Sequence, residues 1–308
     1  MRIAMMGAGG IGGYFGAKLA LAGADVRFVA RGSHLAALRE YGLVVESDQG
    51  AITLPNVQAS DDPLAFGPVD LVVIGVKLWD TEDAARAVLP LVQAGAAAVS
   101  FQNGVRKDAI LRDALGSQAV LGGVSYIAAS IARPGVIRHV GAMQKLVFGE
   151  FGGATSARTQ SLLEACLAAG IDAQISPDIE RSTWEKFVFL AGLSGATTAM
   201  RSQIGPIREN PRARAFLLGL MNEVVAVGRA SGVALAEDFA QNRLAFCDTL
   251  PAQMTSSMHG DLDRGNRLEL PFLGGDVVAM GERLGVPTPL NRAVLDILSL
   301  HQDGRAAL

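Results

Sequence analysis

The first half of the chain alternates short apolar runs with segments of helical periodicity. The apolar runs that we expect to form buried strands cover residues 2–6, 25–30, 69–76 and 96–101, and another strand begins near Val120. Helical spacing of apolar residues covers 14–22, 81–92 and 107–115. Strands that are apolar throughout are typical of a parallel sheet with both faces covered by helices. The pattern predicts an α/β domain with a mostly parallel sheet.

The pattern changes twice further along the chain. Longer extended segments cover 124–148 and break at Pro134-Gly135, which predicts a hairpin at the sheet edge. Beyond Ser176-Pro177 the strand signal stops. Helices are expected over 183–200, over 211–232 behind an Asn210 cap, and over 236–249, 271–284 and 289–300, with a polar stretch at 255–266. We therefore predict two domains, an α/β domain at 1–177 and an all-α domain at 178–308.

Composition and charge exclude several classes of protein. The net charge is −3 and charges of both signs are scattered, so nothing favours nucleic acid or an anionic membrane surface. The apolar N-terminal segment is broken by glycines and continues into a second strand, unlike a signal peptide. The two cysteines, Cys166 and Cys247, and the four histidines lack metal-ligand spacing. We expect a soluble cytoplasmic protein with no metal, no nucleic-acid partner and no membrane association.

A glycine-rich loop follows the first strand and opens the first helix. Its G-x-G-x-x-G pattern is Gly7-Ala8-Gly9-Gly10-Ile11-Gly12. In such loops the first glycine permits the tight turn, the second lets the backbone approach a pyrophosphate, and the third allows close helix–strand packing. The helix N-terminus adds N–H groups and a favourable dipole. We predict a dinucleotide site here; the alternative is a glycine-rich turn without a ligand.

The end of the second predicted strand indicates which dinucleotide is bound. Proteins that bind NAD place an acidic residue there to hold the ribose 2′-hydroxyl, whereas this strand ends in Ala30-Arg31-Gly32-Ser33. Arg31 stands where a guanidinium could hold the 2′-phosphate of NADP through two hydrogen bonds. NADPH is the predicted cofactor, and an exposed surface arginine is the alternative.

Two further polar residues follow strands. Lys77 ends VIGVK and Asn103 lies in SFQNG, both at the carboxyl edge of the predicted sheet, where doubly wound sheets bind ligands. Such residues are also common turn formers, and Asn-Gly is a frequent turn pair. From position alone, both interpretations stay open.

Three residues of the second half carry candidate chemistry. Lys186 lies on a predicted helix beside apolar residues, either extending along that face or serving as a partly desolvated proton donor. Glu269 precedes Pro271 at a helix start, where it could complement the helix dipole. Ser257 could be an N-cap. The residues alone do not decide between these roles.

The motifs together resemble the ketopantoate reductase (2-dehydropantoate 2-reductase) family along nearly the whole chain. The segments that carry the resemblance are GAGGIG, VK at Lys77, QNG at Asn103, PGVIRHVG, WEKF at Lys186, SSMHGDLDRG and RLELPFLGG. Their order and spacing are more specific than any single motif.

The resemblance implies a function and a role for each residue. It implies NADPH-dependent reduction of 2-dehydropantoate to pantoate, for pantothenate and coenzyme A synthesis. Lys186 matches the catalytic lysine that protonates the developing alkoxide, and Glu269 matches the acid that holds substrate. Asn103 matches an asparagine beside nicotinamide and lysine, Ser257 a serine that binds the substrate carboxylate, and Lys77 a lysine near the cofactor.

The sequence departs from the family at two substrate positions. Leu190 and Ser194 stand where the family has asparagines, and Pro271 replaces a usual aspartate. An apolar Leu190 would leave part of a polar substrate unpaired. Three alternatives stay open. The protein could be a reductase of a different, more apolar 2-oxo acid, an enzyme for a longer substrate such as an opine or a sugar acid, or a non-catalytic NADPH sensor. We therefore expect residues 1–177 to form an NADP-binding Rossmann domain. The helical domain at 178–308 is expected to bind the substrate and is also a candidate homodimer interface.

Overall fold

The computed structural model describes residues 1–305 of the 308-residue chain, which form two compact units. The first, the Rossmann unit, contains Met1–Asn103 and Lys107–Ser182. The second, the helical unit, contains Gly104–Arg106 and the chain from Thr183 onward. The division falls at Ser182/Thr183, against residue 177 expected from the sequence, and the three-residue segment 104–106 was not anticipated.

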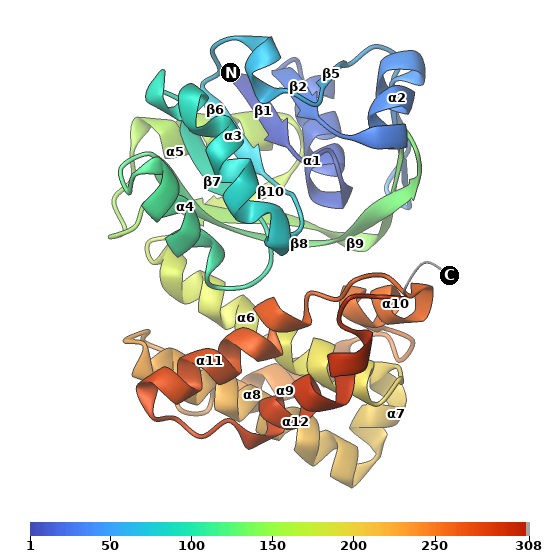
Figure 1. Ribbon diagram of the computed structural model, residues 1–308, viewed down its shortest axis with the longest axis vertical. Coiled ribbons are helices and arrows are strands. Elements are labelled where there is room, and N and C mark those ends of the chain that lie inside the picture. Colours follow the sequence, from blue (N-terminus) through green and yellow to red (C-terminus); the bar gives the residue numbers. More distant parts are fainter. Residues whose placement is uncertain (306–308) are drawn as a thin grey trace. The chain divides into compact units, whose positions relative to one another are not determined.

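The Rossmann unit is built on a ten-stranded sheet within the described chain (Figure 1). Its order is β4-β3-β9-β8-β7-β6-β1-β2-β5, and β10 also pairs with β9. Only β3–β4 and β8–β9 are antiparallel among the described pairs, which confirms the predicted mostly parallel sheet. The strands are β1 (Arg2–Met6), β2 (Asp25–Val29), β3 (Leu43–Ser47), β4 (Ile52–Leu54), β5 (Gln58–Ser60), β6 (Leu71–Ile74), β7 (Ala97–Ser100), β8 (Val120–Arg133), β9 (Val136–Gly149) and β10 (Asp172–Ile175).

Successive residues of the central strands enter two separate cores. Ile3 and Met5 of β1 pack with helices on one face, while Ala4 packs on the other, as the two-residue period of a strand requires. The first face is covered by α1 (Gly10–Leu21), α2 (Gly32–Tyr41) and α5 (Ala157–Ala168). The second is covered by α3 (Thr81–Gln93) and α4 (Lys107–Leu115). Short 3₁₀ turns, η1 (Pro63–Phe66) and η2 (Leu78–Asp80), lie in the connections.

The hairpin β8–β9 is present, but its expected place at the sheet edge is wrong. Residues 44–47 of β3 pair with residues 136–139 of β9, and residues 172–175 of β10 pair with residues 145–148. Both partners join the side of β9 that faces away from β8. The prediction failed because β3 is distant in sequence and neither β3 nor β10 has a distinctive pattern of its own.

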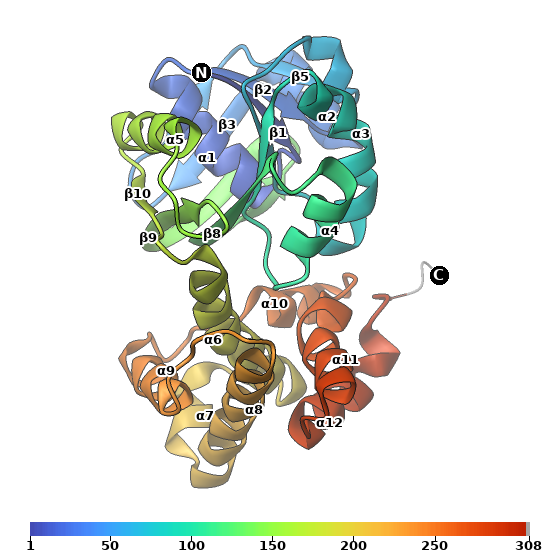
Figure 2. The ribbon, with the colours of Figure 1, turned by 90° about the vertical axis from the view of Figure 1, so that its left-hand side faces the viewer.

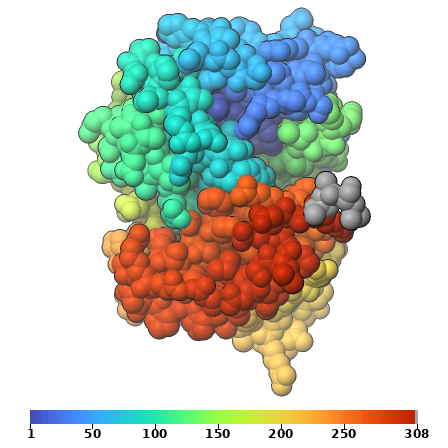
Figure 3. Space-filling view, viewed as in Figure 1, coloured from blue at the N-terminus to red at the C-terminus, as the bar shows by residue number. Residues whose placement is uncertain are grey.

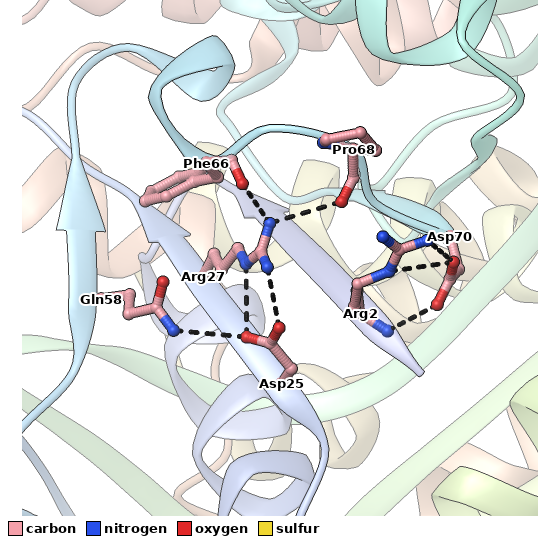
Figure 4. Close-up of polar contacts among 7 residues, drawn as sticks. All are labelled: Arg2, Asp25, Arg27, Gln58, Phe66, Pro68 and Asp70. Atoms are coloured by element: carbon pink, nitrogen blue, oxygen red, sulfur yellow. Dashed lines mark hydrogen bonds and ion pairs between the residues drawn. The ribbon is translucent and has the colours of Figure 1, made fainter.

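Ion pairs cluster near the amino ends of the central strands (Figure 4). Arg2 Nη2 lies 2.6 Å from Asp70 Oδ1, and the Arg2 backbone N–H donates to Asp70 Oδ2 at 2.8 Å. These hydrogen bonds hold the pKa of Asp70 below its usual range. Arg27 pairs with Asp25 at 2.8 Å and donates to the carbonyl of Phe66. These charges lie at the opposite ends of the strands from the predicted site residues.

The helical unit holds the remaining helices (Figure 2). The polar stretch at 255–266, for which no helix was predicted, contains α10, and the segments from α10 onward form much of the helical unit's surface in the view of Figure 3. Asn210 caps α8 by accepting from Arg212 N and Ala213 N, as predicted. The elements are α6 (Ile179–Ala199), α7 (Ile204–Glu209), α8 (Pro211–Ala230), α9 (Phe239–Thr249), α10 (Ser257–Arg264), η3 (Leu270–Phe272), α11 (Gly274–Leu284), α12 (Pro289–Leu298) and η4 (Ser299–His301).

Two glycines explain how α6 packs so closely on its neighbours. A Cβ at Gly192 would lie 2.5 Å from Met221 Cγ, and one at Gly195 would lie 3.2 Å from Leu220 Cδ1. These glycines weaken the intrinsic helix propensity but let α8 approach, and burial compensates. None of the helices among residues 1–305 has the length and apolarity that a membrane crossing requires.

Candidate active site

The glycine loop joins β1 to α1 with a geometry that needs its glycines. Gly7 has φ +104°, a conformation that L side chains rarely adopt. A Cβ at Gly12 would lie 2.2 Å from the Gly7 carbonyl oxygen, and one at Gly10 would lie 2.2 Å from the Ala129 carbonyl oxygen. The loop is therefore packed tightly against its own turn and against β8.

Gly9 differs from its neighbours because it faces open space. A Cβ there would have no atom within 4 Å, and Gly9 is the N-cap of α1 without a side-chain hydrogen bond to the helix. The first N–H groups of a helix have no intrahelical partner, and together with the helix dipole they favour an anion. The residues present fit a dinucleotide pyrophosphate, with the first turn of α1, Gly10, Ile11 and Gly12, as its anion-binding groups.

His34 of α2 connects this loop to the β8–β9 hairpin. Its Nε2 lies 2.9 Å from the Ala8 carbonyl oxygen, and the Gly135 N–H donates to its Nδ1 at 3.1 Å. Because Nδ1 accepts, Nε2 carries the proton, and the ring is neutral in this arrangement. Burial lowers the pKa of His34, and the hydrogen bond to Ala8 opposes that shift. His34 thus has a structural role, since it joins the glycine loop to the hairpin turn.

Arg31 and Lys77 follow the ends of β2 and β6, the two strands that flank β1. Arg31 is the residue before α2, is largely exposed, and lies 3.4 Å from Asp80 through Nη2. Lys77 precedes η2 and is exposed, with its Nζ 5.6 Å from the centre of the Trp79 ring. With the glycine loop after β1 and Asn103 after β7, the structure brings all predicted cofactor residues to four neighbouring strand ends.

Gln102 fixes the position of the segment that carries Asn103, and sequence reasoning missed it. The Gln102 side chain is buried and its Nε2 donates to the Val76 carbonyl and to Thr81 Oγ1, both at 2.9 Å. Ser100 Oγ donates to Gln102 Oε1, also at 2.9 Å. Asn103 itself is half-buried and is followed by Gly104 at φ +79°. A polar residue directly after the strand predicted over 96–101 was the available signal.

Lys186, Ser257 and Glu269 all belong to the helical unit. Lys186 is half-buried on α6, and Glu269 is 6% exposed just before η3. Ser257 is exposed and is the first residue of α10, so its interpretation as an N-cap is wrong. The cap is Ser256, whose Oγ accepts from His259 N at 3.1 Å and lies 3.1 Å from Thr197 Oγ1 of α6. This contact fastens the start of α10 to the helix that carries Lys186.

Several buried polar atoms near this contact have no hydrogen-bond partner. They are Ser194 Oγ and Thr198 Oγ1 of α6 and His259 Nδ1 of α10. Each side chain is at least nine-tenths buried. An unsatisfied buried polar group costs about 1–3 kcal/mol, so water or a ligand is expected at such atoms. Ser194 is one of the two positions that depart from the family asparagines; the other, Leu190, is half-buried.

Comparisons with known proteins agree over the full length. The family model described as "Ketopantoate reductase PanE/ApbA" matches residues 3–153, and the model of its C-terminal part matches residues 178–302. The chain belongs to the ketopantoate reductase family. It is therefore an oxidoreductase. Its fold class and its resemblance, as predicted from the sequence, are confirmed.

Individual proteins give the extent of the likeness. The chain is 34% identical to 2-dehydropantoate 2-reductase of Archaeoglobus fulgidus over 96% of each chain. The structure of a ketopantoate reductase of this family from Ralstonia eutropha JMP134 is 33% identical, with a TM-score of 0.89 over 98% of each chain. D-Mandelate dehydrogenase in complex with NADH and anilino(oxo)acetate has a TM-score of 0.89 over 98% of each chain at 20% identity, a likeness of fold.

Gly9 and Gly10 make a matched pair that separates ligand binding from folding. Gly9→Ala should keep the wild-type melting temperature, because φ is −76° and no atom is close, yet raise the Kd for a nicotinamide dinucleotide about tenfold or more. Gly10→Ala should destabilise the fold by about 3 kcal/mol, because its methyl group meets the backbone of β8. Thermal unfolding and fluorescence titration measure the two effects. Wild-type affinity in Gly9→Ala would contradict the cofactor assignment.

His34 should make the stability of the Rossmann unit pH-dependent. A group whose pKa is lowered on folding contributes stability to the folded state. This stability is fully present above the ordinary pKa of the group and is lost as the pH falls. The free energy of unfolding should therefore decline as the pH falls below about 6.5, the ordinary histidine value, and His34→Gln should reduce this slope. An unchanged slope in His34→Gln, measured by urea unfolding across this range, would show that the bridge does not titrate.

Proposed function

We propose that the chain is an NADPH-dependent reductase of a 2-oxo acid, with 2-dehydropantoate as the substrate to test first and pantoate as its product. The observation that carries the proposal is that this chain, which matches the family models over residues 3–153 and 178–302, retains both Lys186 and Glu269 alongside the glycine loop. A non-catalytic sensor would need the glycine loop alone. The Rossmann unit would bind the cofactor, and the helical unit would bind the substrate.

NADPH is proposed as the cofactor because of the residues around the end of β2. The first residues after this strand are Ala30 and Arg31, without the acidic side chain that would hold a ribose 2′-hydroxyl. Arg31 is exposed and at the start of α2, so its guanidinium and the helix N-terminus could both favour a 2′-phosphate. Asp80 is its present ion-pair partner and would compete with the phosphate.

The chain's own residues would then carry the remaining chemistry. When bound, the nicotinamide supplies the hydride that reduces the carbonyl carbon. Lys186 would donate the proton that the carbonyl oxygen gains, so that the carbonyl becomes a hydroxyl. The buried Glu269 would orient the substrate, Ser257 would hold its carboxylate, and Asn103 would lie beside both the nicotinamide and the substrate. Lys77 would bind near the cofactor phosphates.

A related reductase of another 2-oxo acid is the second candidate, and it is supported by two side chains of α6. Leu190 offers no hydrogen bond, and the Ser194 hydroxyl is buried without a partner. A substrate with an apolar group against Leu190 would avoid the cost that a polar group would meet there. Assembly as a homodimer and a cytoplasmic location remain predictions of the sequence.

The proposed activity can be tested with the purified chain. NADPH consumption should be saturable with 2-dehydropantoate or with one member of a panel of 2-oxo acids. Lys186→Ala should lower kcat about 100-fold or more while the Kd for NADPH stays the same, because the proton donor is lost and the cofactor site is untouched. Lys145→Ala, at an ion pair with Asp172 in the Rossmann unit, is the control and should keep full activity.

Each outcome of this assay is informative. A preference for 2-dehydropantoate supports the first candidate, and a preference for a more apolar acid supports the second. Tight NADPH binding without turnover of any acid would reject both in favour of a sensor. Turnover that survives in Lys186→Ala would remove the lysine from its role.

Arg31 tests the choice of cofactor separately. Arg31→Gln should weaken NADPH binding about tenfold to 100-fold and leave NADH binding nearly unchanged, because only NADPH carries the 2′-phosphate. Arg86, an exposed arginine of α3 in ion pairs with Glu82 and Asp83, provides the control Arg86→Gln. Equal losses for both cofactors would show that Arg31 does not recognise the phosphate.

A further inference from the structure

The three residues after Asn103, Gly104–Arg106, form a short excursion of the chain from one unit into the other. Gly104–Arg106 belong to the helical unit, whereas the residues on both sides belong to the Rossmann unit. The chain thus passes to the helical unit at Asn103 and returns at Lys107, long before the main crossing at Ser182/Thr183. Asn103 is the last residue before this excursion.

Both ends of the excursion are fixed to the Rossmann unit. Before it, Gln102 is held by its hydrogen bonds to Val76 and Thr81. After it, the Lys107 side chain is 1% exposed and its Nζ donates to Asp108 Oδ1 at 2.7 Å and to the Gly123 carbonyl at 3.0 Å. The residues on either side of Asn103–Arg106 are therefore held in place by buried hydrogen bonds.

An ion pair joins the excursion to α11. Arg106 Nη1 lies 2.9 Å from Asp276 Oδ1, and these residues are 170 positions apart in the sequence. The Asp276 side chain is 2% exposed, whereas that of Arg106 is 55% exposed. Burial raises the pKa of Asp276, and the hydrogen bond from Arg106 opposes this. A carboxylate in the first turn of a helix is favourable, but one this deeply buried needs a partner.

We propose that the Arg106–Asp276 ion pair holds the Asn103 loop in its working position, so that both are positioning residues of the reaction. The inference rests on the proposed function for the role of Asn103. Gln102 fixes one side of Asn103, and the ion pair fixes Arg106, three residues after it. Small displacements of a group that contacts the reacting atoms lower the turnover rate strongly, whereas cofactor binding through α1 is unaffected.

Three variants separate positioning from folding. Arg106→Met leaves the Asp276 carboxylate buried without its partner, so it should lower both the melting temperature and kcat. Arg106→Met/Asp276→Ala removes that buried charge as well, so it should recover most of the melting temperature. If the pair positions Asn103, kcat of this double variant should stay about tenfold or more below wild type, with the Kd for NADPH unchanged. Arg106→Lys keeps the charge and should restore part of the rate.

Hydrogen exchange of the backbone amides at residues 103–106 gives a second measurement, which does not depend on turnover. Exchange should be faster in both neutralised variants than in wild type and in Arg106→Lys. Wild-type exchange in the double variant would overturn the proposal, and so would a kcat that recovers together with the melting temperature. If the wild-type chain reduces no 2-oxo acid, the proposed function fails, while the exchange data still decide whether the ion pair holds the loop.

Discussion

The close approach of α1 to the strands beneath it is the constraint on which the Rossmann unit depends. The first turn of α1 lies so near the Gly7 carbonyl and the Ala129 carbonyl that no side-chain carbon fits at Gly12 or Gly10. His34 then closes the remaining side by bridging Ala8 to the hairpin turn. Because protein atoms fix the loop from three directions, its shape is set before a ligand arrives, and Gly9 is left as the open position. A preformed loop of this kind loses little conformational entropy on binding.

In the helical unit, packing of α6 determines which side chains are available for chemistry. Gly192 and Gly195 place one side of this helix against α8 and α12. Lys186, Leu190 and Ser194 are spaced four residues apart and therefore follow one stripe on a different side. Thr197, whose hydroxyl contacts Ser256 and so holds the start of α10, lies on the same side of the helix. A change of substrate in this family could then arise from one stripe of one helix, with the fold and the hydride chemistry retained.

The sequence predicted those features that depend on local pattern. The parallel sheet, the glycine loop and the Asn210 cap follow from apolar runs, turn residues and capping residues within a few positions, and the structure contains all three. Features set by distant partners could not be read in this way. The hairpin was assigned to an edge because nothing in the sequence of β9 indicates that β3 or β10 pairs with it. Arg106 and Asp276 form an ion pair, but each lies in a segment without a distinctive pattern of its own. The helix α10 was not predicted because its sequence is polar. The roles of Lys186 and Glu269 came from the family resemblance and not from their spacing.

The pairing of β3 with β9 has a consequence for how the chain folds as it is made. β3 is complete after Ser47, yet the strand it joins begins at Val136. The β3–β4 hairpin is therefore made early and cannot pair with β9 until residues 48–139, about half of the Rossmann unit, have also left the ribosome. A two-stranded hairpin is marginally stable in water, so these residues are exposed to proteases and chaperones during that interval. Synthesis, rather than the finished structure, is the stage at which this part of the chain is most vulnerable.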